Sequence, residues 1–92
     1  MDALQAMRVF VRVVEAGSFT RAADSLGLPK GTVTKLIQAL EARLRTRLLN
    51  RTTRRVTVTP DGAAYYERSA RLINEFDEME ASITNAQASP RG

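Results

Sequence analysis

The 92-residue chain contains no cysteine and no histidine. It therefore cannot form disulfides or thiolate and imidazole metal sites, and it has no Cys or His to act as a catalytic nucleophile or base. No apolar run approaches the ~20 residues of a membrane-spanning helix, and no signal-peptide pattern opens the chain. Because it also lacks a cofactor loop and a nucleophile–base pair, we expect a binding protein, not an enzyme. A hydrophobic content of 43% favours one folded domain with a modest core.

Basic residues are abundant and unevenly placed along the chain. Residues 1–60 hold 11 Lys and Arg against 4 Asp and Glu, whereas residues 61–92 hold 3 against 6. The stretch from Ala42 to Pro60 has no acidic residue and these arginines: Arg43, Arg45, Arg47, Arg51, Arg54 and Arg55. Such a cluster predicts a polyanionic partner, either nucleic acid or an anionic membrane surface. The alternative at this point is a solvated basic face.

The spacing of apolar residues predicts three helices in the first half of the chain, over about residues 2–16, 19–26 and 29–44. Gly17 and Gly27 mark the ends of the first two, and Ser18 is a suitable N-cap for the second. In the third, the apolar stripe leaves an outward face that contains Gly31, Lys35, Gln38 and Ala42, with Lys30 and Thr34 flanking it.

After residue 44 the apolar period shortens from 3.6 residues toward 2. This change predicts a two-stranded hairpin, with a first strand from Leu49, an exposed basic tip over residues 50–55 and a second strand over 56–59. The tip has no glycine, which favours a longer loop over a two-residue turn.

The Thr59-Pro60-Asp61 sequence is typical of a helix start, and the helix is expected to reach about Ala88. Its apolar residues follow a heptad spacing. Its length of roughly 43 Å exceeds the diameter of a compact body of 60 residues. We expect a second copy of the chain to cover this seam, although the seam could pack only on its own domain. Arg68 and Arg71 near the start and acidic residues near the end favour antiparallel pairing. The predicted dimer interface comprises Val9, Val13, Tyr65, Ser69, Leu72, Phe76, Met79 and Ile83.

The helices over 19–26 and 29–44 together form a helix-turn-helix pattern, with small Ala22 and Ala23 where the two helices cross and Gly27 in the turn. The second of these helices can lie in the major groove of DNA. The hairpin that follows is expected to act as a basic wing on phosphates or in the minor groove. The predicted fold is therefore mainly α, a winged helix-turn-helix followed by a long dimerisation helix.

The stretches Ala16–Ala23, Gln38–Leu44, Leu48–Arg54 and Thr59–Gly62, in this order, resemble the N-terminal DNA-binding domain of LysR-type transcriptional regulators. The resemblance covers about residues 3–88. It implies a cytoplasmic bacterial regulator that binds an interrupted inverted repeat in double-stranded DNA as an antiparallel homodimer. We expect a DNA-binding domain over 1–59, a linker helix over 60–88 and a tail over 89–92, with no cofactor. Family members continue into a C-terminal domain that senses a small-molecule inducer, so this chain is expected to be an isolated fragment.

The same resemblance implies which residues contact DNA. Base-reading positions fall on Lys30, Gly31, Thr34 and Lys35, with Thr32 and Gln38 as adjacent candidates. Wing positions fall on Arg51, Thr52, Thr53, Arg54 and Arg55, and Thr20 and Arg21 are candidates for phosphate contacts.

Pro29, Lys30 and Arg45 depart from the usual family residues, which are a capping Ser, a Gln and a helix-ending Gly. Base preference therefore does not transfer from relatives. The alternative function is a winged helix that binds an acidic protein. An RNA or membrane-surface binder is a weaker alternative, since the chain has only two Tyr and three Phe and RNA-binding modules use exposed aromatic side chains.

Overall fold

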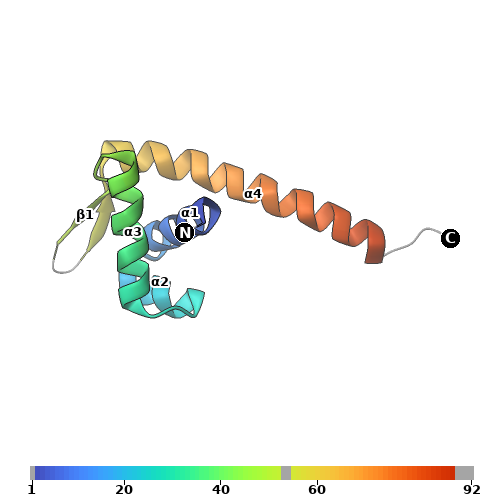
Figure 1. Cartoon of the computed structure of the whole chain (residues 1–92), viewed down its shortest axis with the longest axis horizontal. Coiled ribbons are helices and arrows are strands. Elements are labelled where there is room, and N and C mark those ends of the chain that lie inside the picture. Colours follow the sequence, from blue (N-terminus) through green and yellow to red (C-terminus); the bar gives the residue numbers. More distant parts are fainter. Residues whose placement is uncertain (1, 53–54, 89–92) are drawn as a thin grey trace.

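The computed structural model describes residues 2–52 and 55–88, with side chains up to residue 85. The order of elements is α1 (Ala3–Ala16), α2 (Phe19–Leu26), α3 (Lys30–Leu44), β1 (Leu49–Arg51), β2 (Val56–Val58) and α4 (Pro60–Ala88). Figure 1 shows α1, α2 and α3 grouped together, the hairpin beside α3, and α4 running along α1 and on beyond the group. The predicted fold class, a mainly α winged helix-turn-helix followed by a long helix, is confirmed.

Local signals in the sequence fix the ends of the first two helices. The Ser18 hydroxyl accepts a hydrogen bond from the Arg21 amide at 3.2 Å and so caps α2. Gly17 and Gly27 end α1 and α2 in the left-handed region, with φ of 67° and 68°. Glycine adopts this conformation without the penalty that a Cβ imposes. The predicted caps and helix ends are therefore confirmed.

The core lies where α1, α2 and α3 meet. Phe10 of α1 and Ile37 and Leu40 of α3 are among its largest fully buried side chains. Val9 and Val13 are also fully buried in this core, inside a single chain. Their predicted place in a dimer interface is wrong, because α1 turns both side chains toward its own domain and leaves them no surface for a partner.

The wing is a two-stranded antiparallel sheet in which Leu49 pairs with Val58 and Arg51 with Val56. Asn50 and Arg51 thus belong to β1, and the predicted tip over 50–55 is too long by these two residues. Thr52 directly follows β1 and Arg55 directly precedes β2, and the Thr52 amide donates to the Arg55 carbonyl at 3.0 Å.

The base of the wing is tied to both α3 and α4. A carboxylate oxygen of Glu41 accepts hydrogen bonds from the amides of Leu48 and Leu49, at 2.8 and 3.2 Å. The Thr59 hydroxyl donates to the Arg47 carbonyl at 2.7 Å and accepts from the Gly62 amide at 2.9 Å, which caps α4. These bonds hold the wing in a fixed place beside α3.

The first half of α4 packs along α1. Tyr65 meets the Phe10 ring edge-on, with centroids 5.3 Å apart. The Tyr66 hydroxyl donates to Glu15, and its pKa is raised by burial and by that bond. The Arg8 guanidinium donates two hydrogen bonds to the Asp77 carboxylate, at 2.6 and 3.2 Å. These bonds lower the pKa of the Asp77 carboxyl and raise the pKa of Arg8.

Part of the heptad seam of α4 is covered by this domain, and the rest is exposed to solvent. Ser69 is buried against its own domain, so its predicted role at a dimer interface is wrong, and Tyr65 and Phe76 are half-buried. Leu72, Met79 and Ile83 are 55%, 56% and 60% exposed. Among the residues described, no helix is long and apolar enough to cross a membrane.

Candidate nucleic-acid interface

The N-terminal half of α3 presents a polar face to solvent. Val33, Leu36 and Ile37 anchor the opposite face in the core, which turns the predicted outward residues away from the domain. Thr34 is half-buried, and the exposed members of the predicted set are Lys30, Gly31, Thr32, Lys35 and Gln38. The face carries two lysines and no acid, which suits contacts with acceptors on base edges.

Two adjoining cavities lie between the start of α2 and the wing. The smaller, of about 310 Å³, reaches Lys30 and Thr34 of α3 and Arg51 of β1. The larger, of about 610 Å³, lies between the α1–α2 junction and β2. Both are lined by Gly17, Ser18, Arg55 and Val56, so they form one continuous groove, here named the wing groove.

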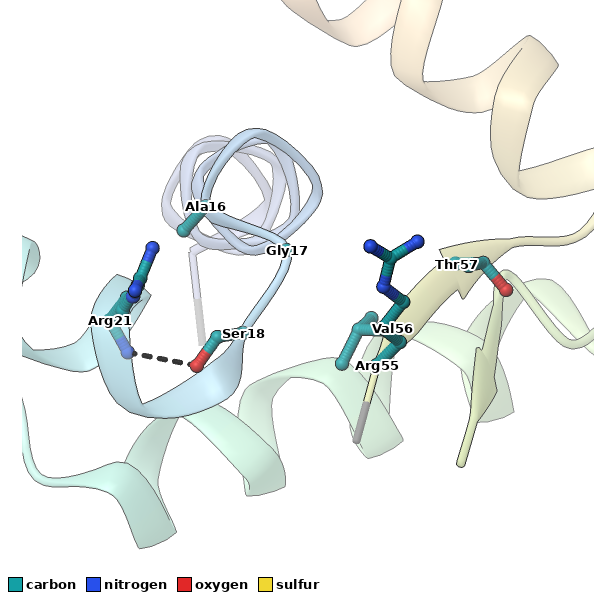
Figure 2. Close-up of a pocket in the computed structure, with 7 residues that line it drawn as sticks. All are labelled: Ala16, Gly17, Ser18, Arg21, Arg55, Val56 and Thr57. Carbon is teal, nitrogen blue, oxygen red and sulfur yellow. Dashed lines mark hydrogen bonds between the residues drawn. The ribbon is translucent and has the colours of Figure 1, made fainter. Parts of the chain in front are cut away.

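Among the residues that the structure describes, the wing groove is lined by no acidic residue and by these cations: Arg21, Lys30, Arg51 and Arg55. Figure 2 shows Arg21 of α2 and Arg55, just before β2, on opposite sides of the larger cavity. None of the four forms an ion pair with a residue that the structure describes. Unneutralised positive charge gathered from three elements makes the groove suited to an anion such as a phosphate.

One of these cations is held in place by an aromatic ring. The guanidinium carbon of Arg51 lies 4.5 Å from the centroid of the Phe19 ring, within the range of a cation–π contact. Phe19 opens α2 and is buried in the core, whereas Arg51 is exposed at the end of β1. The contact joins the wing to the helix-turn-helix unit.

The structure brings together many of the residues predicted to contact DNA. Those lining the wing groove are Thr20, Arg21, Lys30, Thr34, Arg51, Thr52 and Arg55. Gly31, Thr32, Lys35 and Gln38 lie outside its lining, on the exposed face of α3. The predicted wing residues Thr53 and Arg54 lie outside the described part of the chain.

The sequence analysis missed two residues that shape this surface. Phe19 was not among the predicted site residues, since no spacing rule links it to Arg51, 32 positions further on. Glu41, whose carboxylate holds the wing backbone, was not among them either, because no sequence pattern relates it to the amides that it binds. No group of three or more potential metal ligands occurs in the part of the chain that the structure describes.

A helix-turn-helix with an exposed basic reading face and a basic wing defines the class of winged-helix DNA-binding domains. The model of the bacterial regulatory helix-turn-helix proteins of the lysR family matches residues 4–63, and the chain belongs to this family.

Known relatives agree with this assignment. The chain is 52% identical over 92 residues to an HTH-type transcriptional repressor of Pseudomonas aeruginosa (strain UCBPP-PA14), covering all of this chain and 29% of the repressor. The crystal structure of a complex of BenM_DBD with catB site 1 DNA matches with a TM-score of 0.89 and 35% identity, covering 99% of this chain and 100% of that one. The structure of CrgA, a LysR-type regulator from Neisseria meningitidis, matches with a TM-score of 0.79 and 37% identity, covering 100% of this chain and 31% of that one.

The curated relatives are transcriptional regulators, not enzymes, as the sequence predicted. This chain spans under a third of the length of three such relatives, and it corresponds to their helix-turn-helix region.

Proposed function

We propose that this chain binds double-stranded DNA sequence-specifically as a homodimer and thereby regulates transcription in the bacterial cytoplasm. The observation that carries the proposal is the juxtaposition of the exposed polar face of α3 with the acid-free wing groove. A base-reading element and a phosphate-binding element side by side are what specific DNA recognition needs. We keep residues 1–59 as the DNA-binding domain, 60–88 as the linker helix and 89–92 as a tail.

In this proposal α3 enters the major groove and reads base edges. Lys30 and Lys35 carry donors that suit the O6 and N7 acceptors of guanine, and Gln38 suits adenine. A Cβ added at Gly31 would have nothing within 4 Å, so this stretch of backbone is open and can come close to the DNA. Thr32 and Thr34 provide hydroxyls for bases or phosphates.

The wing contacts the DNA backbone or the minor groove in the same complex. Arg51, Thr52 and Arg55 line the groove beside α3, with Thr20 and Arg21 at the start of α2. Thr53 and Arg54 complete the proposed wing contacts. Arginine suits this position because its planar fork can bind a phosphate through two hydrogen bonds.

The homodimer forms through antiparallel α4 helices. The exposed apolar side chains of Leu72, Met79 and Ile83 follow the heptad seam and need a cover. Antiparallel packing sets Arg68 and Arg71 of one copy beside the acidic end of the other, which parallel packing would not do. The half-buried Tyr65 and Phe76 form the edge of this interface. Two-fold symmetry then implies an interrupted inverted repeat in the DNA.

Selection of bound sequences from a pool of random duplexes tests the proposal. We expect enrichment of two inverted half-sites separated by about one helical turn or a multiple of it. Enrichment of single half-sites only would contradict the dimer. Binding that selects no sequence at all would contradict specific recognition, because the groove would then hold DNA only through its phosphates. No binding at low salt would contradict DNA binding itself and leave an acidic protein as the partner of the basic groove.

A further inference from the structure

We propose that the smaller cavity of the wing groove holds one backbone phosphate of DNA on the guanidinium of Arg51, and that Phe19 is the positioning residue that orients this guanidinium before DNA arrives. This inference rests on the proposed DNA binding. It goes further by naming the guanidinium that binds the phosphate and the aromatic ring that orients that guanidinium.

The position of the ring is fixed by the core. Phe19 is 8% exposed and belongs to the buried core cluster, together with Ala22, Ala23 and side chains of α3. Arg51 is the last residue of β1, and its backbone is held by pairing with Val56. With both ends anchored, a 4.5 Å contact between guanidinium and ring restrains the long side chain that connects them.

A cation–π contact leaves donors of the guanidinium available. When the contact is made through the flat face of the group, its five N–H donors point outward along the edge. A phosphate can therefore take two hydrogen bonds from Arg51 without breaking the contact with Phe19. Because the side chain is already restrained, less rotamer entropy is lost on binding than for a free arginine.

The surroundings of Arg51 fit a phosphate and no cation. The same cavity, of about 310 Å³, is lined by Lys30 and Arg55 and by the hydroxyl-bearing Thr34 and Thr52. Acidic side chains are absent from its lining among the described residues. The Thr52 hydroxyl already donates to the Arg55 carbonyl at 3.1 Å, so positive charge and the Thr34 hydroxyl are what this space, beside the face of α3 proposed to read bases, offers a phosphate.

The charge of Arg51 and its orientation can be separated experimentally. Arg51→Gln removes the charge, Arg51→Lys keeps the charge but lacks a planar face, and Phe19→Leu keeps an apolar side chain but lacks the ring. Affinity for a random-sequence duplex and for the duplex selected above is measured by fluorescence anisotropy over a range of NaCl concentrations. The slope of log affinity against log salt counts the phosphates neutralised.

Because the proposed dimer carries two copies of Arg51, we expect Arg51→Gln to reduce the magnitude of this slope by about 1.8 on both duplexes, which is about 0.9 for each copy. Phe19→Leu and Arg51→Lys keep the slope and lower the affinity by about three- to tenfold at every salt concentration. The double variant Phe19→Leu/Arg51→Lys loses no more DNA affinity than either single variant, because each substitution removes the same contact.

Phe10→Leu is the matched control, because Phe10 is equally aromatic and buried but contacts Tyr65 instead of a cation. It is expected to lower the melting temperature and leave DNA affinity unchanged. Wild-type affinity in Phe19→Leu, or additive losses in the double variant, would overturn the role of Phe19. An unchanged slope in Arg51→Gln would overturn the phosphate site. Failure of the wild-type protein to bind any duplex would instead contradict the proposed function.

Discussion

At the scale of single residues, Arg45 occupies a position that suits glycine. It ends α3 in the left-handed region with φ of 57°, as the one non-glycine residue with positive φ in the described part of the chain. A side chain with a Cβ is strained there. We expect Arg45→Gly to raise the free energy of unfolding by about 0.5–1 kcal/mol, measured by urea denaturation.

Arg43→Gly is the control for this prediction. Arg43 is also an exposed arginine but lies within α3, where glycine costs about 1 kcal/mol. The two substitutions should therefore change stability in opposite directions. A loss of stability in both variants would show that the Arg45 side chain contributes more than its backbone strain costs.

Lys35 offers a residue-scale test of base reading. It is exposed on the outward face of α3 and lies outside the lining of the wing groove. If it contacts a base, Lys35→Ala should weaken binding to the selected duplex by about 1–3 kcal/mol and hardly change binding to a random duplex. Both affinities are measured by anisotropy at one salt concentration. Equal losses of affinity for the two duplexes would indicate that Lys35 contacts a phosphate and not a base.

Residues whose role depends on near neighbours were predictable from the sequence. The caps at Ser18 and Thr59 and the helix ends at Gly17 and Gly27 involve partners within four positions along the chain. The contact of Arg51 with Phe19 depends on how the whole domain folds, so no local pattern could predict it.

At the scale of elements, the wing and α4 meet at Gly62. A Cβ on this glycine would lie 1.9 Å from the Leu48 carbonyl oxygen, which belongs to the backbone and cannot move aside freely. We expect Gly62→Ala to destabilise the protein by more than about 2 kcal/mol, because the start of α4 must shift away from the wing. Thermal unfolding followed by circular dichroism measures the effect.

Gly31→Ala provides the comparison within the same chain. A Cβ at Gly31, also in a helix, would meet no other atom within 4 Å. Alanine should stabilise the protein there by up to about 1 kcal/mol, as helix propensity predicts. If Gly62→Ala is also stabilising, the close packing of α4 on the wing does not exist in solution.

The pairing of Arg8 with Asp77 makes the attachment of α4 to α1 dependent on pH. The bonds from Arg8 lower the pKa of the Asp77 carboxyl, so the folded state favours the charged form. The contribution to stability is present above the pKa of an unfolded aspartate, ~3.9, and is lost as pH falls through the lower folded pKa. Asp77→Asn should be less stable than wild type at neutral pH and should approach it in acid, as measured by urea denaturation at a series of pH values. A constant difference between the two would contradict the charge-dependent pairing.

The seam of α4 shows what periodicity can and cannot predict for an element. The heptad spacing correctly predicted one apolar face along a long helix. It could not assign that face to a partner, because intrachain and interchain packing use the same spacing. Ser69 is buried, and Tyr65 and Phe76 are half-buried beside Phe10 and Arg8 of α1, whereas Leu72, Met79 and Ile83 stay exposed. Met79 and Ile83 follow Asp77, which pairs with Arg8 near the start of α1, but Leu72 is exposed between two covered positions. Which seam positions are covered therefore depends on where α1 lies in the folded chain, which the sequence of α4 does not contain.

At the scale of the whole molecule, the elongated shape sets up the test of dimerisation. The described chain measures 57 × 25 × 22 Å, and the far end of α4 extends beyond the winged domain (Figure 1). The double variant Met79→Glu/Ile83→Glu places charge on the exposed seam without touching the core. Burial of each such side chain contributes about 1.5–3 kcal/mol, so we expect the dimer dissociation constant to rise about 100-fold or more in sedimentation equilibrium.

The double variant Asn74→Glu/Ala81→Glu adds the same charge on the opposite side of α4, midway between seam positions, and both residues are exposed. It should dimerise like wild type, which separates the effect of the seam from that of net charge. In the seam variant, affinity for the full inverted repeat should fall while affinity for a single half-site stays the same, because each winged domain remains folded. Loss of half-site binding as well would show that the far end of α4 supports the winged domain itself, and a dimer that survives the seam variant would place the two-fold contact elsewhere.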